Sequence, residues 1–245
     1  MIIDFHVHLG SDKDGKVQTP GGLKNLMEES GTDFAVVFPF DEKDSLEKAS
    51  RALLVYSEGN PHLIPFLRFD PNTTTEESLG TLLSYKFRGV KLHPRSQDFD
   101  PTDRKYFGLY KLIEERGLPV LFHTRKESTP YSDPDRIIEL AQYFPRLIII
   151  LGHFGAYSWN VIEKMKAYKN VYLEISGPYS SAGRIEAVAK EIGYERILFG
   201  SDAPYFNPRD EARKIYESKL PDEAKRAILG ENAARLLGLK VAVPA

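Results

Sequence analysis

The stretch that decides the fold stands at the start of the chain, where residues 2–9 read Ile-Ile-Asp-Phe-His-Val-His-Leu. Polar and apolar residues alternate here, which is typical of a β-strand because successive side chains point to opposite faces. The alternation predicts that Asp4, His6 and His8 share one face, while the apolar residues at the odd positions face helices. The Cα atoms of the two histidines would then lie about 6.6 Å apart, close enough for both imidazoles to bind one metal ion. The alternative is a pair of histidines that are merely hydrogen-bonded inside the protein.

Short apolar runs of this kind recur along the whole chain, and β-branched and aromatic residues are frequent in them. They are short enough for strands and are bounded by segments of different character. The predicted strands are 2–9, 34–38, 63–69, 89–93, 120–123, 147–153, 171–176 and 197–202.

Segments with helical spacing separate these runs, and several begin with a residue that favours a helix start. Thr75 precedes acidic residues, which suit the positive end of a helix dipole, and Asp133 precedes a proline at the first helical position. The predicted helices are 45–56, 75–86, 103–116, 133–144, 159–168, 184–192 and 210–218.

The alternation of strands and helices predicts the fold class. Eight strands followed by helices in about 250 residues match an α/β protein of the (β/α)8 TIM-barrel type, with a doubly wound open sheet as the alternative. No repeat or linker divides the chain, so we expect residues 1–245 to form a single barrel domain with C-terminal helices.

The composition excludes several classes of function. The chain has 42% hydrophobic and 28% charged residues and a formal net charge of −2, so neither nucleic acid nor an anionic membrane is an expected partner. The absence of cysteine excludes disulfides, thiolate metal sites and cysteine nucleophiles. We find no secretory signal and no run of the roughly 18 apolar residues that a membrane helix needs. The expected location is therefore cytoplasmic.

Polar residues end several of the predicted strands. His123 ends Val-Leu-Phe-His, His153 ends Ile-Ile-Ile-Leu-Gly-His and Asp202 ends Ile-Leu-Phe-Gly-Ser-Asp. The active sites of TIM barrels lie at the carboxyl ends of the strands, so these side chains should meet His6 and His8 at one mouth. Three imidazoles and a carboxylate suit zinc or a similar metal, with a position left for water.

Several motifs together carry a resemblance to a known family. Asp-x-His-x-His in residues 4–8, Leu-Gly-His-Phe-Gly in 151–155 and Phe-Gly-Ser-Asp-Ala-Pro in 199–204 resemble the amidohydrolase superfamily. Gly-Val-Lys-Leu-His-Pro in 89–94 and Gly-Glu-Asn-Ala-Ala-Arg-Leu-Leu-Gly-Leu in 230–239 resemble its amidohydrolase-related branch, which includes aminocarboxymuconate-semialdehyde decarboxylase and resorcylate-type decarboxylases. The resemblance covers residues 2–239.

The resemblance implies a division of roles among these residues. His6, His8, His123 and Asp202 would bind one divalent metal, with zinc expected first and manganese, iron or cobalt as alternatives. Asp202 would also receive a proton from water that the metal activates. His153 would act beside the metal as an acid or base, or stabilise negative charge on the substrate.

Lys91 shares a predicted face with His93, so its side chain should enter the barrel. In binuclear members of the superfamily a lysine on the fourth strand is carboxylated and bridges two metals, which makes a second metal held through Lys91 an alternative. The resemblance to the narrower branch favours one metal, with Lys91 free to bind a substrate carboxylate. Lys91 could instead pair with Glu174 or Asp70, and His93 could be either a site residue or a packed neighbour of Pro94.

Arg68 shares a face with Phe66 and Asp70, so it could bind an anion in the pocket or form an ion pair elsewhere. We therefore expect substrate binding by Arg68, Lys91 and His93 and a small substrate that carries a carboxylate. Residues 11–21 and 95–101 are predicted to be the longest loops, and they could cover the site.

The first functional hypothesis is a metal-dependent hydrolase of a small carboxylated ester, lactone or amide. The alternatives are a metal-dependent decarboxylase of a small aromatic or unsaturated acid and a barrel that binds metal or ligand without catalysis. A TatD-like nuclease or a PHP-type phosphoesterase also begins with His-x-His, but the fourth strand supplies Lys91 and His93 where the former has a glutamate. A homodimer is expected from the resemblance alone.

Overall fold

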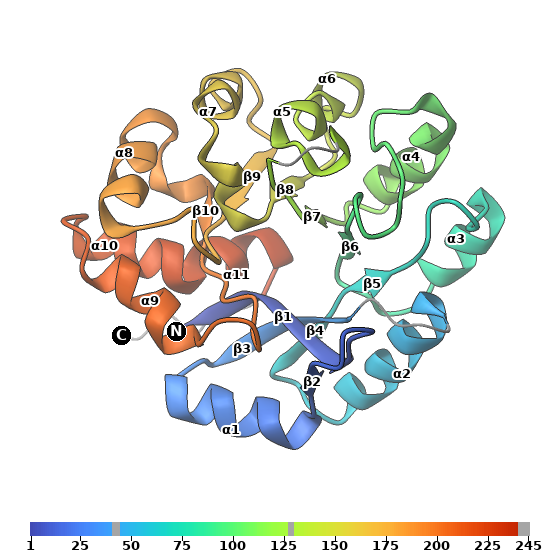
Figure 1. Ribbon diagram of the computed structural model, residues 1–245, viewed down its shortest axis with the longest axis horizontal. Coiled ribbons are helices and arrows are strands. Elements are labelled where there is room, and N and C mark those ends of the chain that lie inside the picture. Colours follow the sequence, from blue (N-terminus) through green and yellow to red (C-terminus); the bar gives the residue numbers. More distant parts are fainter. Residues whose placement is uncertain (41–44, 127–129, 240–245) are drawn as a thin grey trace.

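The protein is described by a computed structural model covering residues 1–40, 45–126 and 130–239. Parallel strands form a ring, and the helices surround it (Figure 1). The strands pair in the orders β2-β1-β3-β4 and β10-β9-β8-β7-β6-β5. Among the strands of the described residues, only β2 is antiparallel to its neighbour, because it forms a hairpin with the end of β1.

The strands are short, as in most barrels. They are β1 (Ile3–Ser11), β2 (Val17–Gln18), β3 (Phe34–Pro39), β4 (Leu63–Pro65), β5 (Leu67–Arg68), β6 (Val90–Leu92), β7 (Val120–Phe122), β8 (Ile149–Leu151), β9 (Val171–Glu174) and β10 (Ile197–Leu198).

The helices follow the strands in turn. They are α1 (Pro20–Ser30), α2 (Leu46–Glu58), α3 (Glu76–Leu82), α4 (Phe107–Glu115), α5 (Pro134–Ile137), α6 (Leu140–Tyr143), α7 (Trp159–Met165), α8 (Ala182–Ile192), α9 (Pro208–Tyr216), α10 (Asp222–Arg226) and α11 (Asn232–Leu237). Short turns of other helix types are η1 (Arg104–Tyr106), η2 (Pro130–Ser132), η3 (His153–Tyr157), η4 (Tyr194–Arg196) and η5 (Ala227–Glu231).

Backbone hydrogen bonds close the ring at both seams. The amide of Phe66, between β4 and β5, donates to Val37 of β3 at 2.9 Å, so β4 and β5 act as one strand. On the other side, the amide of His8 donates to Ala203 just beyond β10 at 2.8 Å. With β2 outside the ring and β4 and β5 counted together, the ten strands make an eight-stranded barrel. The predicted (β/α)8 fold is confirmed, and each predicted strand overlaps an observed one.

The predicted helix starts are confirmed where capping residues marked them. Ser45, Thr75 and Asp133 each accept a hydrogen bond from an amide of the helix that follows, which satisfies a donor that the helix itself leaves unpaired. The sequence prediction missed α1, although Thr19 caps it in the same way. The expectation of a plain loop over 11–21 was wrong, because residues 17–18 pair with the end of β1.

A β-bulge in β1 changes which side chains enter the barrel. The pairing register with β3 shifts between Asp4 and Val7, so Phe5 and His6 together lie opposite one residue of β3. Phe5 packs edge to face against Phe66, with ring centroids 5.5 Å apart. A bulge of this kind aims two consecutive side chains at the same region.

The apolar interior shows the consequence. Phe5 belongs to a buried cluster with Leu121 and Ile150, which pair in register with Lys91 and therefore face the inside of the barrel. The prediction that every odd position of β1 faces the helices was wrong for Phe5 and correct for Val7, which packs with residues of α1 and α2.

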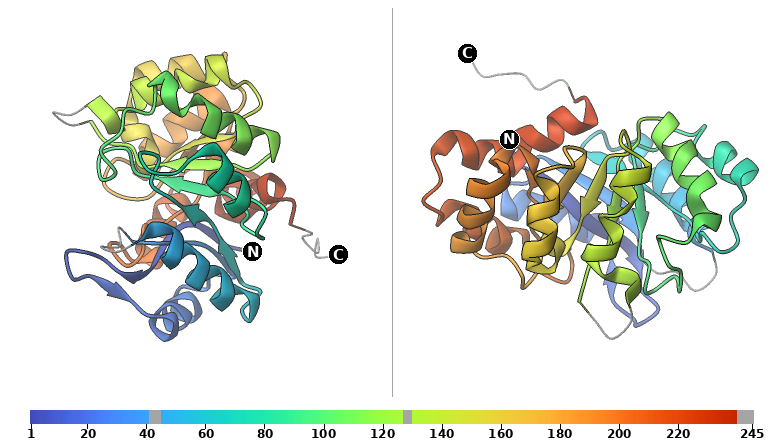
Figure 2. Two further views of the ribbon diagram at one scale, coloured as in Figure 1. Left: turned by 90° about the vertical axis from the view of Figure 1, so that its right-hand side faces the viewer. Right: turned by 90° about the horizontal axis from the view of Figure 1, so that it is seen from above.

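The C-terminal helices lie beside the N-terminus (Figure 2). Ala233 and Leu237 of α11 join the same buried cluster as Ile3 and Leu198, so α11 packs near the amino ends of the strands. The polar site described below lies at the opposite, carboxyl end. In the part of the chain that the structure describes, no helix has both the length and the apolar character for a membrane crossing.

Candidate active site

A cavity of about 460 Å³ opens at the carboxyl ends of the strands. Six of the eight predicted site residues line it, and they come from strands all around the barrel: His8, Arg68, Lys91, His93, His123 and Asp202. The other two, His6 and His153, are buried directly against these side chains. The structure therefore brings all eight together.

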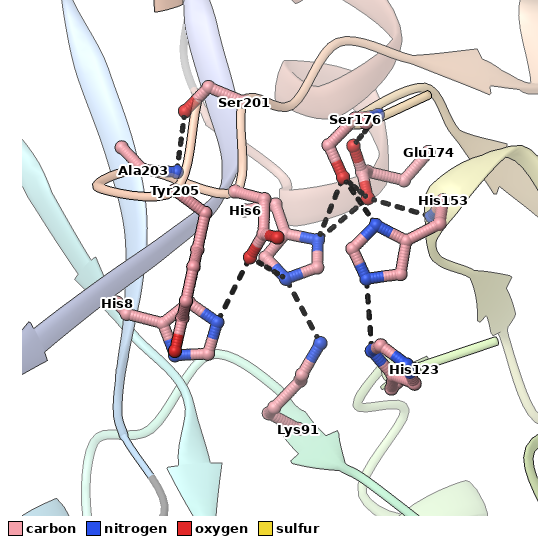
Figure 3. Close-up of polar contacts among 12 residues, drawn as sticks. His6, His8, Lys91, His123, His153, Glu174, Ser176, Ser201, Ala203 and Tyr205 are labelled. Atoms are coloured by element: carbon pink, nitrogen blue, oxygen red, sulfur yellow. Dashed lines mark hydrogen bonds and ion pairs between the residues drawn. The ribbon is translucent and has the colours of Figure 1, made fainter. Parts of the chain in front are cut away.

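His6 is oriented by a carboxylate from another strand. Its Nδ1 lies 2.7 Å from Oε2 of Glu174 at the end of β9, and both side chains are fully buried (Figure 3). A carboxylate only accepts, so Nδ1 must donate the proton, and a neutral His6 then directs the lone pair of Nε2 into the site. Burial and Lys91 lower the pKa of His6, but Asp202 and Glu174 outweigh them and the pKa is raised.

Asp202 faces two imidazoles at once. Its Oδ1 lies 3.2 Å from Nε2 of His6 and 3.1 Å from Nε2 of His8. Burial raises the pKa of Asp202, but the two histidines dominate and hold it well below its usual range. The backbone amide of Asp202 also donates to the carbonyl of His6 at 2.8 Å, which fixes the two residues relative to each other.

Asp4 supports this arrangement from behind. Its Oδ1 accepts the amide of Ser201 at 2.9 Å, and its Oδ2 accepts the Ser201 hydroxyl at 2.5 Å. The carboxylate also accepts the amide of His6 at 3.1 Å. The prediction that Asp4 shares the face of His6 and His8 was wrong, because its carboxylate joins β1 to the segment just before Asp202. Burial raises the pKa of Asp4 to about 7.

His153 begins the left-handed turn η3. The φ angles of His153 and Phe154 are 50° and 56°, and those of the next three residues are also positive, at 55°, 50° and 53°. Nε2 of His153 lies 2.9 Å from Nδ1 of His123, and Nδ1 lies 3.1 Å from the hydroxyl of Ser176 (Figure 3). Burial lowers the pKa of His153 to about 4, so the imidazole is neutral at pH 7.

The residues fit a divalent metal. His6, His153 and Asp202 are buried and offer one ligand atom each, all within 4.8 Å of one another. Two of these atoms, Nε2 of His6 and Oδ1 of Asp202, are acceptors that face each other, an arrangement that favours a cation between them. Nδ1 of His8 is also buried and has no hydrogen-bond partner among the described residues.

This closest group differs from the predicted ligand set in one respect. The prediction placed His8 and His123 among the ligands and His153 beside them, whereas the structure places His153 among the three closest donors. His8 contacts Asp202, and His123 contacts His153, so both remain within one contact of the group. The ligand set stays a prediction.

Lys91 enters the barrel, as expected from its register. Its Nζ lies 3.1 Å from Nε2 of His6 (Figure 3). The same atom lies 4.9 Å from the ring centroid of Phe38. Its hydrogen bond thus goes to His6, not to Glu174 or Asp70. Burial, with help from the charge of Arg68, lowers the pKa of Lys91 to about 7.

His93 and Arg68 lie on the same side of the cavity as Lys91. The ring of His93 stacks on His123 with centroids 3.7 Å apart and planes at 11°. Arg68 is 1% exposed, and its Nη1 donates to the carbonyl of Pro39 at 3.2 Å. Both residues line the cavity, so their predicted contact with a substrate remains open to test.

The sequence reasoning missed the roles of Glu174 and Ser176. Glu174 was expected only as a possible partner for Lys91, and no role was predicted for Ser176. The signal was their spacing of two, which puts both on one face of β9 and its extension. The hairpin was also missed: Asp12 accepts a hydrogen bond from the Tyr205 hydroxyl at 2.8 Å and lines the cavity.

Comparison with known proteins agrees with the resemblance. The model of the Amidohydrolase family matches residues 3–239. Gamma-resorcylate decarboxylase of Rhizobium radiobacter is 25% identical over 258 aligned positions, which cover 80% of this chain and 77% of that protein.

Two solved structures illustrate the shared fold. 5-Carboxyvanillate decarboxylase from Sphingomonas paucimobilis has a TM-score of 0.80 at 16% identity, covering 98% of this chain and 99% of that one. A dihydroxybenzoic acid decarboxylase from Polaromonas, solved with bound manganese and the inhibitor 2-nitroresorcinol, has a TM-score of 0.79 at 16% identity, covering 98% of both chains.

The family match extends over nearly the whole barrel, and it includes every residue of the polar site. The relatives are enzymes, so the alternative of a barrel without catalysis is not supported. The chain therefore belongs to the amidohydrolase family, as an enzyme similar to the resorcylate-type decarboxylases of its amidohydrolase-related branch.

Proposed function

We propose that the protein is a metal-dependent decarboxylase of a small hydroxylated aromatic carboxylic acid. The observation that carries the proposal is a single cavity with a buried His-His-Asp group on one side and Arg68, Lys91 and His93 on another. The first can hold a metal, and the second can bind a carboxylate. The similarity to decarboxylases of resorcylate and carboxyvanillate supports the substrate class and moves this reaction ahead of hydrolysis.

We assign the metal to His6, His8, His123 and Asp202, with His153 near enough to take part. A divalent ion bound there would polarise oxygen atoms of the substrate and offset their negative charge. Glu174 supports the assignment, because a carboxylate on the far nitrogen of a ligating histidine fixes its tautomer and raises its basicity. Zinc is the first expectation from the sequence, and manganese is the ion in the Polaromonas relative.

The reaction requires a proton at the carbon that loses carbon dioxide. The bond between the ring and the carboxylate breaks, its electron pair stays on the ring carbon, and a proton takes the place of CO2. We assign transfer of that proton to His153: because the imidazole is neutral at rest, it takes up a proton from solvent and passes it to the ring carbon, and it is held between Ser176 and His123 beside the candidate metal ligands. Proton transfer by a positioned side chain contributes about 10²–10⁴-fold to the rate of many enzymes.

The cavity suits a single aromatic ring. Phe40 stacks on His8 with ring centroids 4.8 Å apart, and Tyr205 meets the same histidine edge to face at 5.6 Å. Both aromatic residues line the cavity. They would shield the ring from water while its oxygen atoms face the metal and the basic side chains.

The test is turnover by the purified, metal-analysed protein. We expect release of CO2 and formation of resorcinol from 2,6-dihydroxybenzoate, with one metal per chain and a large loss of activity in Asp202→Asn. Failure of stoichiometrically metallated protein to decarboxylate any of a panel of hydroxybenzoates and carboxyvanillates would refute the proposal.

Hydrolysis of a small carboxylated lactone or ester is the second candidate. Asp202 favours it, because its carboxylate lies among His6 and His8 where it could accept a proton from attacking water. The same protein preparation distinguishes the two, since lactone opening without CO2 release would replace decarboxylation by hydrolysis.

A further inference from the structure

We propose that His93 binds the substrate through its Nε2–H, which donates a hydrogen bond to an anionic oxygen of a carboxylate substrate. The inference rests on the proposed function for the class of substrate. It assigns to one histidine of the cavity a fixed role as donor, set by the loop that follows β6.

The Nδ1 side of His93 faces its own loop. The amide of Ser96 donates to Nδ1 of His93 at 3.2 Å. The amide of His93 donates to Oε1 of Gln97 at 2.6 Å, and the amide of Gln97 donates back to the carbonyl of His93 at 2.9 Å. The imidazole is therefore part of a closed turn and not a side chain at the end of a flexible loop.

These contacts determine the tautomer. A backbone amide can only donate, so Nδ1 of His93 must accept and carries no proton. An imidazole without a proton on Nδ1 carries one on Nε2. His93 is thus neutral in this turn, and the nitrogen away from the Ser96 amide can act only as a donor.

The imidazole ring of His93 packs against His123, one of the proposed metal ligands. It stacks on His123 with centroids 3.7 Å apart and an angle of 11° between the planes. The residue lines the cavity of about 460 Å³ and is only half-buried, so its ring is open to that cavity. A fixed donor beside the cavity is a suitable contact for a ligand acceptor.

The surroundings select an anionic acceptor. Arg68, Lys91 and Arg95 line the same cavity, and their side chains carry N–H donors and no acceptor atoms. Three carboxylates also line it: Asp202 lies against the candidate metal-binding histidines, Asp12 accepts the Tyr205 hydroxyl, and Asp14 lies beside Asp12 in the loop that joins β1 to β2. A planar oxyanion, such as a carboxylate, is the chemistry that the side near His93 can bind.

Two substitutions separate the two nitrogens of His93. In His93→Asn the side-chain carbonyl oxygen can still accept a hydrogen bond from the amide of Ser96, but the side chain is too short to place a donor at the position of Nε2. In His93→Gln the longer side chain can place an NH2 group near that position. We expect metal-loaded His93→Asn to bind 2,6-dihydroxybenzoate and benzoate about tenfold more weakly or worse, because a hydrogen bond to a charged group is lost. We expect His93→Gln to stay within about threefold of wild type.

The measurements are titration calorimetry with these two probes and nitrogen NMR of the histidine rings in the wild-type protein. The spectrum should show His93 protonated at Nε2 and not at Nδ1, a result that needs no variant and no substrate. Equal affinities of both variants and wild type, an equal loss in both, or protonation at Nδ1 would overturn the inference. So would failure of wild type to bind either probe. Binding that depends on His93 without any release of CO2 would instead refute only the proposed reaction.

Discussion

Two sides of one cavity contain the same residue type and give it opposite character. On the carboxylate side, His6 lies between Glu174 and Asp202, and these carboxylates raise its pKa against the effect of burial. On the basic side, His93 lies near Arg68 and Lys91, and burial with these charges holds its pKa well below the ordinary value. Burial lowers the pKa of both imidazoles, so the charged neighbours account for the opposite directions.

The difference shows that the neighbouring strands determine what each histidine can do. Carboxylates from β9 and from beyond β10 prepare His6 to face a cation, whereas the turn after β6 and the charges near it prepare His93 to face an anion. Under the proposed function, a metal and a carboxylate substrate would therefore take neighbouring places in one cavity. Substitutions on each side should have separable effects.

The largest effect is expected from removing the charge of Asp202, the carboxylate that contacts both His6 and His8. Asp202→Asn removes the charge that His6 and His8 share, so metal content should fall and kcat/KM should decrease by about 10³-fold. Metal analysis and CO2 release measure the two quantities. Asp12→Asn, at the same cavity but bonded to Tyr205, is the matched control and should retain its metal. Normal metal content in Asp202→Asn would contradict the assignment.

The next effect comes from the residue behind His6. Glu174→Gln leaves the side-chain size unchanged but weakens the hold on Nδ1 of His6, so metal affinity should fall about 10–100-fold. Competition with a chelator of known affinity measures it. Glu114→Gln is the control, because that carboxylate accepts the amides of Arg146 and Leu147 and does not contact the site. Equal affinities of Glu174→Gln and wild type would show that the pair has only a structural role.

Breaking the basic side should change substrate affinity more than metal content, although Nζ of Lys91 also contacts Nε2 of His6. Lys91→Met should raise KM for a carboxylate substrate about tenfold, since a charged donor at the cavity is lost. Metal content should remain one ion per chain. Lys105→Met, a surface control whose ammonium pairs with Asp103, should leave KM unchanged. A drop from two ions to one in Lys91→Met would instead support the predicted alternative of a carboxylated lysine between two metals.

The smallest effect concerns a carboxylate outside both sides. Burial raises the pKa of Asp135, but hydrogen bonds from Ser158, Asn160 and Lys126 outweigh it and the pKa is lowered. The charged form therefore stabilises the folded protein at a pH above the ordinary pKa, and this contribution is lost as the pH falls through the folded value. Urea unfolding of wild type and Asp135→Asn should differ by at most about 1 kcal/mol near neutral pH and converge in acid. A difference that grew in acid would contradict this sign.

Much of the fold could be predicted because its signals are local. Ser45, Thr75 and Asp133 mark helix starts by their own chemistry, and they cap helices in the structure. Strand-ending residues such as His123 and Asp202 indicated the mouth of the barrel because parallel strands end at one face.

The rest depends on contacts that no local pattern encodes. The bulge in β1 arises from its register with β3, so the simple alternation placed Phe5 and Asp4 on the wrong faces. The bond between His6 and Glu174 joins positions 168 residues apart, and spacing within one strand cannot predict it. The organisation as one domain and the expected homodimer stay predictions, which sedimentation of the full chain would test.

The left-handed turn η3 lowers the stability of the fold while it positions His153 for the proposed reaction. An L-residue in this conformation costs roughly 1–2 kcal/mol, and His153, Phe154, Ala156 and Tyr157 all adopt it. The segment that presents His153 is therefore conformationally strained, and the contacts around it must offset that strain. Selection for thermal stability alone would favour replacing the left-handed conformation. Retaining this conformation would keep the imidazole of His153 in its position beside the candidate metal ligands.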